Sequence, residues 1–206
     1  MMRRNNNNKR NRASGQNKNN GSAEDTISCL VLGTGGAGKT LLVRKIKHIC
    51  KMLLNDTNSE DMKENIFNLS TIVTTGMEVT KVPFENKTLH FREVGSPLLM
   101  MWPTYFKKCQ IILYVVSASN LGQISGAWME FLEILGADET ADKQIILVFN
   151  KLDQCDPGEG AAAAREVFRP GDLRRAAAQR LAAVETSAAN GHGLLTLLQQ
   201  IAEFGR

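Results

Sequence analysis

Short apolar runs alternate with longer amphipathic stretches along most of this chain. The apolar runs have strand length and predict strands at residues 26–32, 78–84, 87–94, 110–117, 144–149 and 182–186. Apolar residues at helical spacing predict helices at residues 39–53, 98–107, 121–136, 160–168 with 172–181, and 192–204. Pro170 and Gly171 break the fourth of these stretches in two. The alternation predicts an α/β fold, a mostly parallel six-stranded sheet flanked by about five helices.

A glycine-rich loop follows the first predicted strand. Residues 33–40 read GTGGAGKT and fit the pattern G-x-x-x-x-G-K-[S/T] between a strand and a helix, which is the context of a phosphate-binding loop. Backbone N–H groups would cradle the phosphates, Lys39 would reach the β- and γ-phosphates, and the Thr40 hydroxyl would bind Mg²⁺. The expected nucleotide contacts in this loop are Gly35, Gly36, Ala37, Gly38, Lys39 and Thr40. A turn without a ligand is the alternative, and the matching context disfavours it.

A second motif indicates which base is bound. Asn150, Lys151 and Asp153 lie in the sequence NKLD, directly after the apolar run 145–149. The Asp153 carboxylate can accept two hydrogen bonds from the N1–H and N2–H₂ edge of guanine, and adenine would leave it unpaired. Asn150 can orient the base, and the stem of Lys151 can lie along the ring. A polar turn between strand and helix is the alternative.

Several segments resemble the Arf-like branch of the small GTPases, whose pattern residues 25–205 follow. Residues 73–79, VTTGMEV, resemble the first switch, and residues 102–106, WPTYF, resemble the second switch helix. Within the branch, residues 91–95 and 169–172 are most similar to one subfamily. The resemblance implies a single P-loop NTPase domain that binds GTP or GDP with Mg²⁺.

The resemblance also implies roles for particular residues. Thr74 would sense the γ-phosphate and Mg²⁺, with Thr75 as the alternative. Thr40, Thr74 and Glu93 would then form the metal site. Ser187 and Ala188 match a Ser-Ala pair whose alanine N–H contacts guanine O6 in Ras-like GTPases. Ser96 stands where a glycine N–H approaches the γ-phosphate.

Three departures from the family pattern fall in the segment that usually reads D-x-x-G-Q. Glu93 replaces an aspartate that meets Mg²⁺ through a water, and its extra methylene shifts that geometry. Ser96 replaces the glycine and adds a Cβ atom that restricts the backbone. Pro97 replaces the glutamine that orients the attacking water, and proline has neither a polar side chain nor an N–H. We therefore expect slow or partner-dependent hydrolysis and assign no catalytic residue.

The first residues differ in composition from the rest of the chain. The first 21 hold eight Asn, six of the 25 basic residues and none of the 21 acidic ones. We expect a disordered basic tail at residues 1–24 and a GTPase domain at residues 25–206, and the chain after residue 21 has a charge near −2. The high isoelectric point is therefore no evidence for a specific nucleic-acid partner. We expect a cytoplasmic protein without a transmembrane span, and Met2 excludes an N-myristoyl anchor on the residue after the initiator.

Two function classes remain open. The first is a guanine-nucleotide switch that recruits effector proteins through its switch segments, with an exchange factor and a GTPase-activating protein as further partners. The second is a pseudo-GTPase, a nucleotide-bound interaction scaffold that hardly cycles. Only Glu93, Ser96 and Pro97 separate the two. A nucleoside or metabolite kinase is a distant third, which Asn150 and Asp153 argue against.

Overall fold

Six strands form one sheet in the computed structural model, which describes residues 25–54, 68–156, 161–177 and 180–205. The strands are β1 (Asp25–Leu32), β2 (Met77–Phe84), β3 (Lys87–Val94), β4 (Ile111–Ser117), β5 (Gln144–Asn150) and β6 (Leu181–Glu185). Their order across the sheet is β2-β3-β1-β4-β5-β6. Only the β2–β3 pair is antiparallel, and the other four pairings are parallel. The predicted fold class, an α/β domain with a mostly parallel six-stranded sheet, is confirmed.

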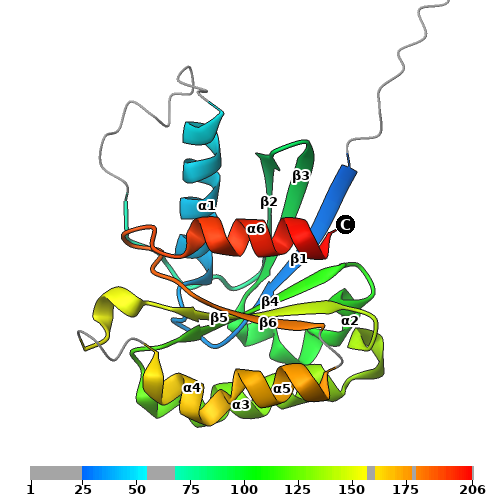
Figure 1. Cartoon of the computed structure of the whole chain (residues 1–206), viewed down its shortest axis with the longest axis vertical. Helices are drawn as coiled ribbons and strands as arrows, with labels where there is room; N and C mark the ends of the chain where they lie inside the picture. Colours follow the sequence, from blue (N-terminus) through cyan, green and yellow to red (C-terminus); the bar gives the residue numbers. More distant parts are fainter. Residues whose placement is uncertain (1–24, 55–67, 157–160, 178–179, 206) are drawn as a thin grey trace, which may run out of the picture.

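Helices connect most of the strands and cover the sheet (Figure 1). The α-helices are α1 (Lys39–Leu53), α2 (Pro103–Phe106), α3 (Leu121–Gly136), α4 (Ala162–Phe168), α5 (Pro170–Ala176) and α6 (Leu194–Phe204). Short 3₁₀ helices span Ser96–Met101, Asp138–Thr140 and Leu152–Gln154. The described residues thus hold six α-helices, because α4 and α5 are separate elements.

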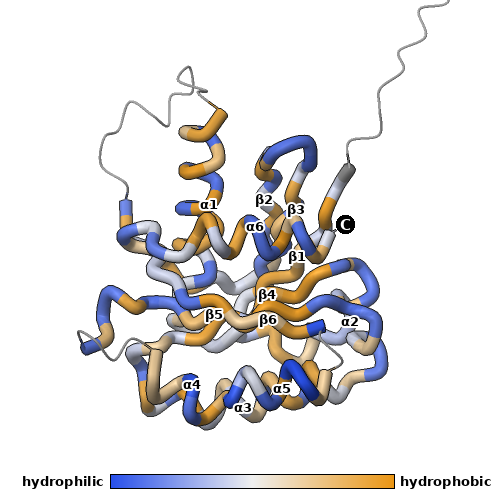
Figure 2. Tube along the Cα trace, in the orientation of Figure 1, coloured by the Kyte–Doolittle hydropathy of each residue, from blue (hydrophilic) through white to orange (hydrophobic). Residues whose placement is uncertain are grey.

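Two hydrophobic cores lie on the two faces of the sheet (Figures 1 and 2). The first core packs α1 and α6 against one face, with Leu42, Ile46 and Leu198 fully buried. The second packs α2 to α5 against the other face, where Phe131 and Phe168 are fully buried. Figure 2 shows apolar residues along the central strands and polar ones in the connections. Burial on both faces explains why these strands have continuous apolar sequences.

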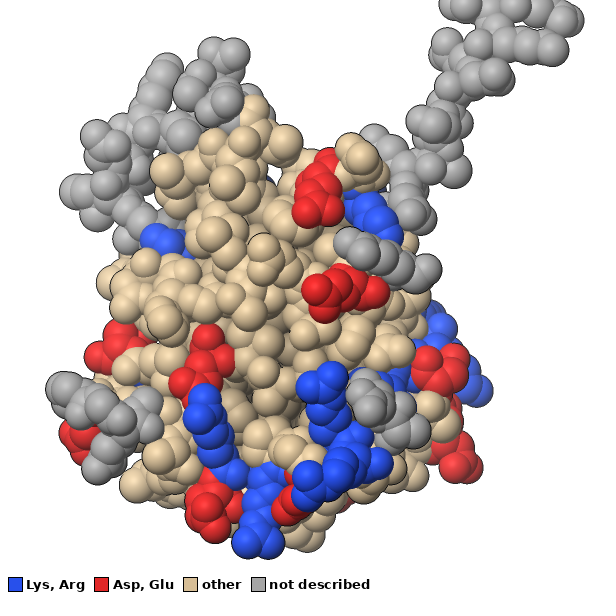
Figure 3. All heavy atoms as spheres, in the orientation of Figure 1, with Lys and Arg blue, Asp and Glu red and all other residues tan. Residues whose placement is uncertain are grey.

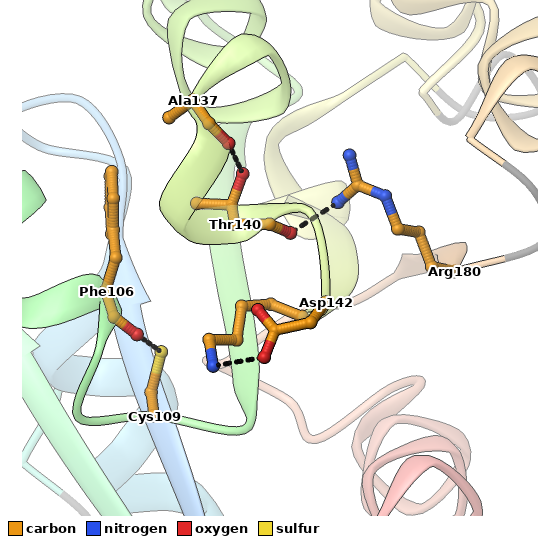
Figure 4. Close-up of polar contacts among 7 residues, drawn as sticks. Phe106, Cys109, Ala137, Thr140, Asp142 and Arg180 are labelled. Atoms are coloured by element: carbon orange, nitrogen blue, oxygen red, sulfur yellow. Dashed lines mark hydrogen bonds and ion pairs between the residues drawn. The ribbon is translucent and has the colours of Figure 1, made fainter.

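The connection from α3 to β5 is held by side-chain hydrogen bonds (Figure 4). The Thr140 hydroxyl donates to the carbonyls of Ile134 and Ala137, at 2.5 and 2.9 Å. Arg180 Nη1 donates to the carbonyl of Thr140 at 3.0 Å. These contacts lie at the amino ends of β5 and β6. They anchor the end of the sheet opposite to the loops that carry the sequence motifs.

Two predicted helices differ from the structure. The single helix predicted at residues 98–107 is instead the 3₁₀ helix Ser96–Met101 followed by the four-residue α2 (Pro103–Phe106). The helix predicted at residues 172–181 is wrong at both ends, since α5 begins at Pro170 and ends at Ala176, and β6 begins at Leu181. Proline is tolerated at the first position of a helix. Arg169 makes the break instead, with a left-handed φ of 40°. The break between the two helices therefore lies one residue before the predicted Pro170 and Gly171.

Other expectations concern the surface and the termini. Figure 3 shows Lys and Arg beside Asp and Glu on the face formed by α4 and α5. Arg175 pairs there with Asp172, and Arg165 pairs with Glu185. All four cysteines are free thiols. No helix among the described residues has the length and apolar character to cross a membrane. The predicted tail at residues 1–24 lies outside the described residues.

Candidate nucleotide-binding site

The glycine-rich loop joins β1 to α1 at the carboxyl edge of the parallel strands, where sheets of this kind bind ligands. Gly38 has a φ of 89°, and a Cβ atom there would lie 2.6 Å from Nδ2 of Asn150. The site therefore requires a residue without a side chain at position 38. This close approach places the glycine-rich loop against Asn150, the first residue of the NKLD motif.

Lys39 places a positive charge inside the loop. Its side chain is buried, and Nζ donates to the carbonyls of Gly33 and Thr34, at 2.7 and 3.0 Å. Burial lowers the pKa of Lys39, and the nearby Glu93 carboxylate opposes that shift. The ammonium group is therefore held at the base of the loop by neutral acceptors, and no carboxylate among the described residues forms a direct ion pair with it. An anionic ligand in the loop would compensate its charge.

Three side-chain oxygens converge beside Lys39 from different parts of the chain. Glu93 Oε1, at the end of β3, accepts hydrogen bonds from Thr40 Oγ1 at 2.5 Å and from Thr74 Oγ1 at 3.2 Å. The two hydroxyls lie 3.0 Å apart. Thr75 does not join this group and instead lines a groove between α1 and β2. The structure therefore brings Thr74, rather than Thr75, to Thr40 and Glu93.

This group of oxygens has the chemistry of a magnesium site. Hydroxyl and carboxylate oxygens are the hard ligands that Mg²⁺ prefers, usually together with substrate phosphates. Among the described residues, no three His, Cys, Asp or Glu side chains are clustered as metal ligands. A cation here would thus depend on one carboxylate, two hydroxyls and the oxygens of a bound ligand. The residues present fit Mg²⁺ better than a softer metal.

A cavity of about 150 Å³ opens above these groups. Its walls come from the glycine-rich loop, the segment before β2 and the end of β3. The lining residues are Gly36, Gly38, Lys39, Thr40, Thr71, Ile72, Val73, Thr74, Glu93, Gly95 and Ser96. Four of the six predicted loop residues and all three predicted metal residues thus share one cavity, which Ser96 also borders. Gly35 and Ala37 do not line it.

The second motif lies beside the loop and is organised by Asn150. This residue is fully buried, and its Nδ2 donates to the carbonyl of Ala37 at 2.9 Å. Its Oδ1 accepts from Thr186 Oγ1 at 3.2 Å and from the N–H of Ala188 at 3.1 Å. Asn150 therefore joins the phosphate loop to the loop after β6. The N–H of Ala188, for which the family resemblance implies a contact with guanine, binds Asn150 in this structure.

Asp153 and Lys151 remain available to a ligand. Asp153 is exposed, and one oxygen of its carboxylate accepts from Ser187 Oγ at 2.5 Å. Lys151 has a φ of 68°, which is uncommon for a residue with a side chain. The stem of Lys151 also borders Gly38, since its Cε lies 3.7 Å from the position of a Cβ atom there. Asp153, Lys151 and Ser187 thus surround a position next to the phosphate loop.

Sequence reasoning missed two contributors to this site. Thr186 is fully buried and donates to Asn150, a role that its polar character before Ser187 could have suggested. Gly95 donates its N–H to the carbonyl of Gly76 at 2.9 Å, and a Cβ atom on Gly95 would lie 2.0 Å from the carbonyl oxygen of Thr74. No local signal predicts that contact, because it joins segments far apart in the sequence.

The chain is similar to known proteins over most of its length. The sequence model of the ADP-ribosylation factor family matches residues 14–204. Human ADP-ribosylation factor-like protein 16 is 30% identical over 172 residues, which are 82% of this chain and 82% of that protein. Residues 91–95 and 169–172 had indicated this subfamily. ADP-ribosylation factor 3 of Arabidopsis thaliana is 28% identical over 167 residues, 80% of each chain.

The solved structures support the same fold. The small GTPase Arl6 (BBS3) from Trypanosoma brucei, solved with the bound nucleotide analogue GppNp, aligns with a TM-score of 0.68. The alignment covers 87% of this chain and 97% of that one, at 15% identity, and so concerns the fold alone. The match of the family model over residues 14–204, together with the 30% identity to a human member, shows that this chain belongs to the ADP-ribosylation factor family of small GTPases.

Proposed function

We propose that this chain binds GTP and GDP with Mg²⁺ and acts as a molecular switch whose GTP hydrolysis is slow or depends on a partner. One observation carries the proposal: the phosphate loop, the Thr40–Thr74–Glu93 oxygens and the NKLD motif meet at one edge of the sheet. Each group fits a different part of a guanine nucleotide. The phosphate loop contacts both other groups, since Thr40 donates to Glu93 and Asn150 donates to Ala37, as a phosphate between a metal and a base would require.

The phosphate and metal contacts follow from the side chains present. Lys39 would donate to the β- and γ-phosphates from a buried position, where charge-assisted hydrogen bonds are strong. Thr40 and Thr74 would hold Mg²⁺, with Glu93 as a direct or water-mediated partner. Bound Mg²⁺ would neutralise charge on the β- and γ-phosphate oxygens. Thr74 would thus couple the first switch segment to the presence of the third phosphate.

The proposed guanine contact rests on Asp153. Its exposed carboxylate can accept from the two guanine donors, while Ser187 holds one of its oxygens. The buried Asn150 would position the loops around the base, as its bonds to Ala37 and Ala188 indicate. A carboxylate left unpaired by adenine would disfavour ATP.

The switch segments expose an apolar surface that suits an effector protein. Large apolar side chains are exposed in the first switch, in β2 and in the 3₁₀ helix after β3: Ile72, Val73, Met77, Val79, Met100 and Met101. Ile72 and Met100 are the most exposed, at 86% and 91%. Clusters of exposed apolar residues often mark protein interaction sites. We infer that effectors bind here when the third phosphate holds Thr74 in place.

Slow hydrolysis follows from the residues after β3. Pro97 lies at the start of the 3₁₀ helix Ser96–Met101 and offers no side-chain donor or acceptor for the attacking water. The alternative function, a pseudo-GTPase scaffold, rests on Pro97 together with Glu93 and Ser96. The two differ only in whether another side chain or a partner protein can position water.

Nucleotide identification followed by single-turnover hydrolysis tests this proposal. Purified protein should carry guanine nucleotide, Lys39→Ala should lose it, and Lys47→Ala, an exposed lysine on the same helix, should keep it. Intrinsic hydrolysis should be on the order of 10⁻⁴ per second or slower, the rate of a Ras-type enzyme without its activator. Equal affinity for ATP and GTP would contradict the guanine assignment. A rate above about 10⁻² per second would contradict slow turnover.

A further inference from the structure

The Ser96 hydroxyl borders the phosphate loop. A Cβ atom on Gly35 would lie 3.2 Å from Ser96 Oγ, which is the nearest atom to that position. Gly35 belongs to the glycine-rich loop, whereas Ser96 follows the last strand residue of β3 by two positions. The hydroxyl therefore faces the loop from a separate part of the chain.

The structure gives this hydroxyl no internal hydrogen-bonding role. Among the described residues, no hydrogen bond to Ser96 Oγ is formed, and the 3₁₀ helix that begins at Ser96 has no side-chain cap. Ser96 is partly buried and lines the same cavity as Lys39, Thr40, Thr74 and Glu93. A serine hydroxyl can donate one hydrogen bond and accept two. The Ser96 hydroxyl can therefore form all of these hydrogen bonds with a ligand in the cavity.

The neighbouring residue removes a competing donor. Pro97 has no N–H, so its backbone cannot donate to a ligand in the cavity. At this part of the wall, the Ser96 hydroxyl is therefore the donor that lies against Gly35. A terminal phosphate is rich in acceptor oxygens, and hydrogen bonds to charged groups are about twice as strong as neutral ones.

We propose that the Ser96 hydroxyl donates a hydrogen bond to the terminal phosphate of a bound nucleoside triphosphate and so increases the preference for triphosphate over diphosphate. This inference rests on the proposed nucleotide-binding function. It assigns a specificity-determining role to a side chain where the family pattern has glycine and only a backbone contact. The β-phosphate, which both nucleotides share, lies nearer Lys39 in this assignment.

Three variants separate the hydroxyl from the rest of the side chain. Ser96→Ala keeps the Cβ atom and removes the hydroxyl, Ser96→Thr keeps both, and Ser96→Gly removes both. Ser125→Ala, on the exposed surface of α3, is the control for a serine elsewhere. The dissociation constants of GDP and of a non-hydrolysable GTP analogue are measured with Mg²⁺ for each protein.

We expect Ser96→Ala and Ser96→Gly to weaken the triphosphate analogue about tenfold or more, with GDP affinity nearly unchanged. Ser96→Thr and Ser125→Ala should keep the wild-type ratio of the two constants. A loss of folded protein lowers both apparent affinities alike, so the ratio reports the phosphate contact.

The outcomes distinguish this inference from the proposed function. A wild-type protein that binds neither nucleotide overturns both. A wild-type protein that binds both nucleotides, with the same ratio in Ser96→Ala, overturns only the role of the hydroxyl. If Ser96→Ala and Ser96→Thr lower the preference for the GTP analogue over GDP equally, the shape of the side chain rather than its hydroxyl is responsible. The inference is then also wrong.

Discussion

Asn150 and Asp153 belong to the same four-residue motif but differ in exposure. Asn150 is fully buried, and its side-chain amide forms hydrogen bonds with Ala37, Thr186 and Ala188. Asp153 is exposed, and one oxygen of its carboxylate accepts no hydrogen bond from a described residue. Asn150 therefore holds the loops together, whereas Asp153 is the residue that would contact the base in the proposed function.

Asp153→Asn should invert the base preference. The variant presents an amide N–H₂ in place of one carboxylate oxygen, so it can donate to the acceptor that xanthine carries where guanine has a donor. We expect GTP to bind on the order of 10³-fold more weakly and xanthosine triphosphate to bind more tightly than in the wild type. A competition assay measures both. Asp156→Asn, an exposed residue of the same loop, should change neither affinity. Unchanged GTP binding in Asp153→Asn would contradict the role of Asp153.

At the scale of elements, the site depends on how the first switch segment meets the end of β3. The N–H of Gly95 donates to the carbonyl of Gly76, and the Thr74 carbonyl lies against the Cα of Gly95. This backbone contact places the Thr74 hydroxyl within 3.2 Å of Glu93. The proposed metal ligands thus come together only when segment 74–76 packs on β3.

Gly95→Ala should therefore weaken triphosphate and Mg²⁺ binding. The added Cβ atom would lie 2.0 Å from the Thr74 carbonyl oxygen, so the segment must move away. Overpacking of this kind costs about 1–3 kcal/mol, which corresponds to about 5- to 150-fold in affinity. Gly76→Ala is the matched control, because a Cβ atom there meets nothing within 4 Å. Titrations with a GTP analogue and Mg²⁺ measure both variants. Equal losses in the two would show that the contact at Gly95 is unimportant.

The packing and pairing of the elements explain which of them could be predicted from the sequence. The strand predictions agree with the structure to within one residue at each end. The buried parallel strands β4 and β5 were recognisable because they have continuous apolar runs. The end of α5 was missed, since Ala177 and its neighbours favour a helix while the pairing of Leu181 with Ile145 draws the chain into β6. Motif residues were found by spacing. The contacts of Thr186 and Gly95 could not be, because they depend on segments that only the fold brings together.

At the scale of the whole molecule, an aromatic cluster joins α3, α4 and β5 on the sheet face away from α1. The ring of Phe168 lies 5.3 Å from Trp128 and 5.7 Å from both Phe131 and Phe149. Phe149 directly precedes Asn150. The core on this face therefore supports the strand that carries the second motif.

Phe168→Ala should destabilise the whole domain. Removing a fully buried ring costs about 3–5 kcal/mol, because a cavity remains among the other rings. In a domain of this size, that corresponds to a fall in melting temperature of about 6–20 °C. Val167→Ala, at a position that is 41% exposed, should have a small effect. Thermal unfolding without added nucleotide measures both. Similar melting temperatures for the two variants would contradict a central role for the cluster.

Stability and ligand binding are linked, because a nucleotide that binds only the folded chain shifts the unfolding equilibrium. At a ligand concentration 100 times the dissociation constant, the gain is about 2.7 kcal/mol, or about 5–10 °C in melting temperature. In the proposed function, the Thr40, Thr74 and Glu93 oxygens contribute to this gain through bound Mg²⁺. Without a cation, these three groups hydrogen-bond to one another at 2.5 to 3.2 Å.

Removal of Mg²⁺ with a chelator should therefore have an effect that depends on the nucleotide. With a GTP analogue present, the chelator should remove much of the melting-temperature gain, because Thr74 is then uncoupled from the third phosphate. The loss should be smaller with GDP, since Thr40 is the only proposed metal ligand outside the switch segment and β3. Without nucleotide, the chelator should leave the melting temperature unchanged. A gain that survives chelation with the GTP analogue would show that the triphosphate is held by Lys39 and the loop alone, and that the Thr40–Thr74–Glu93 group is not a metal site.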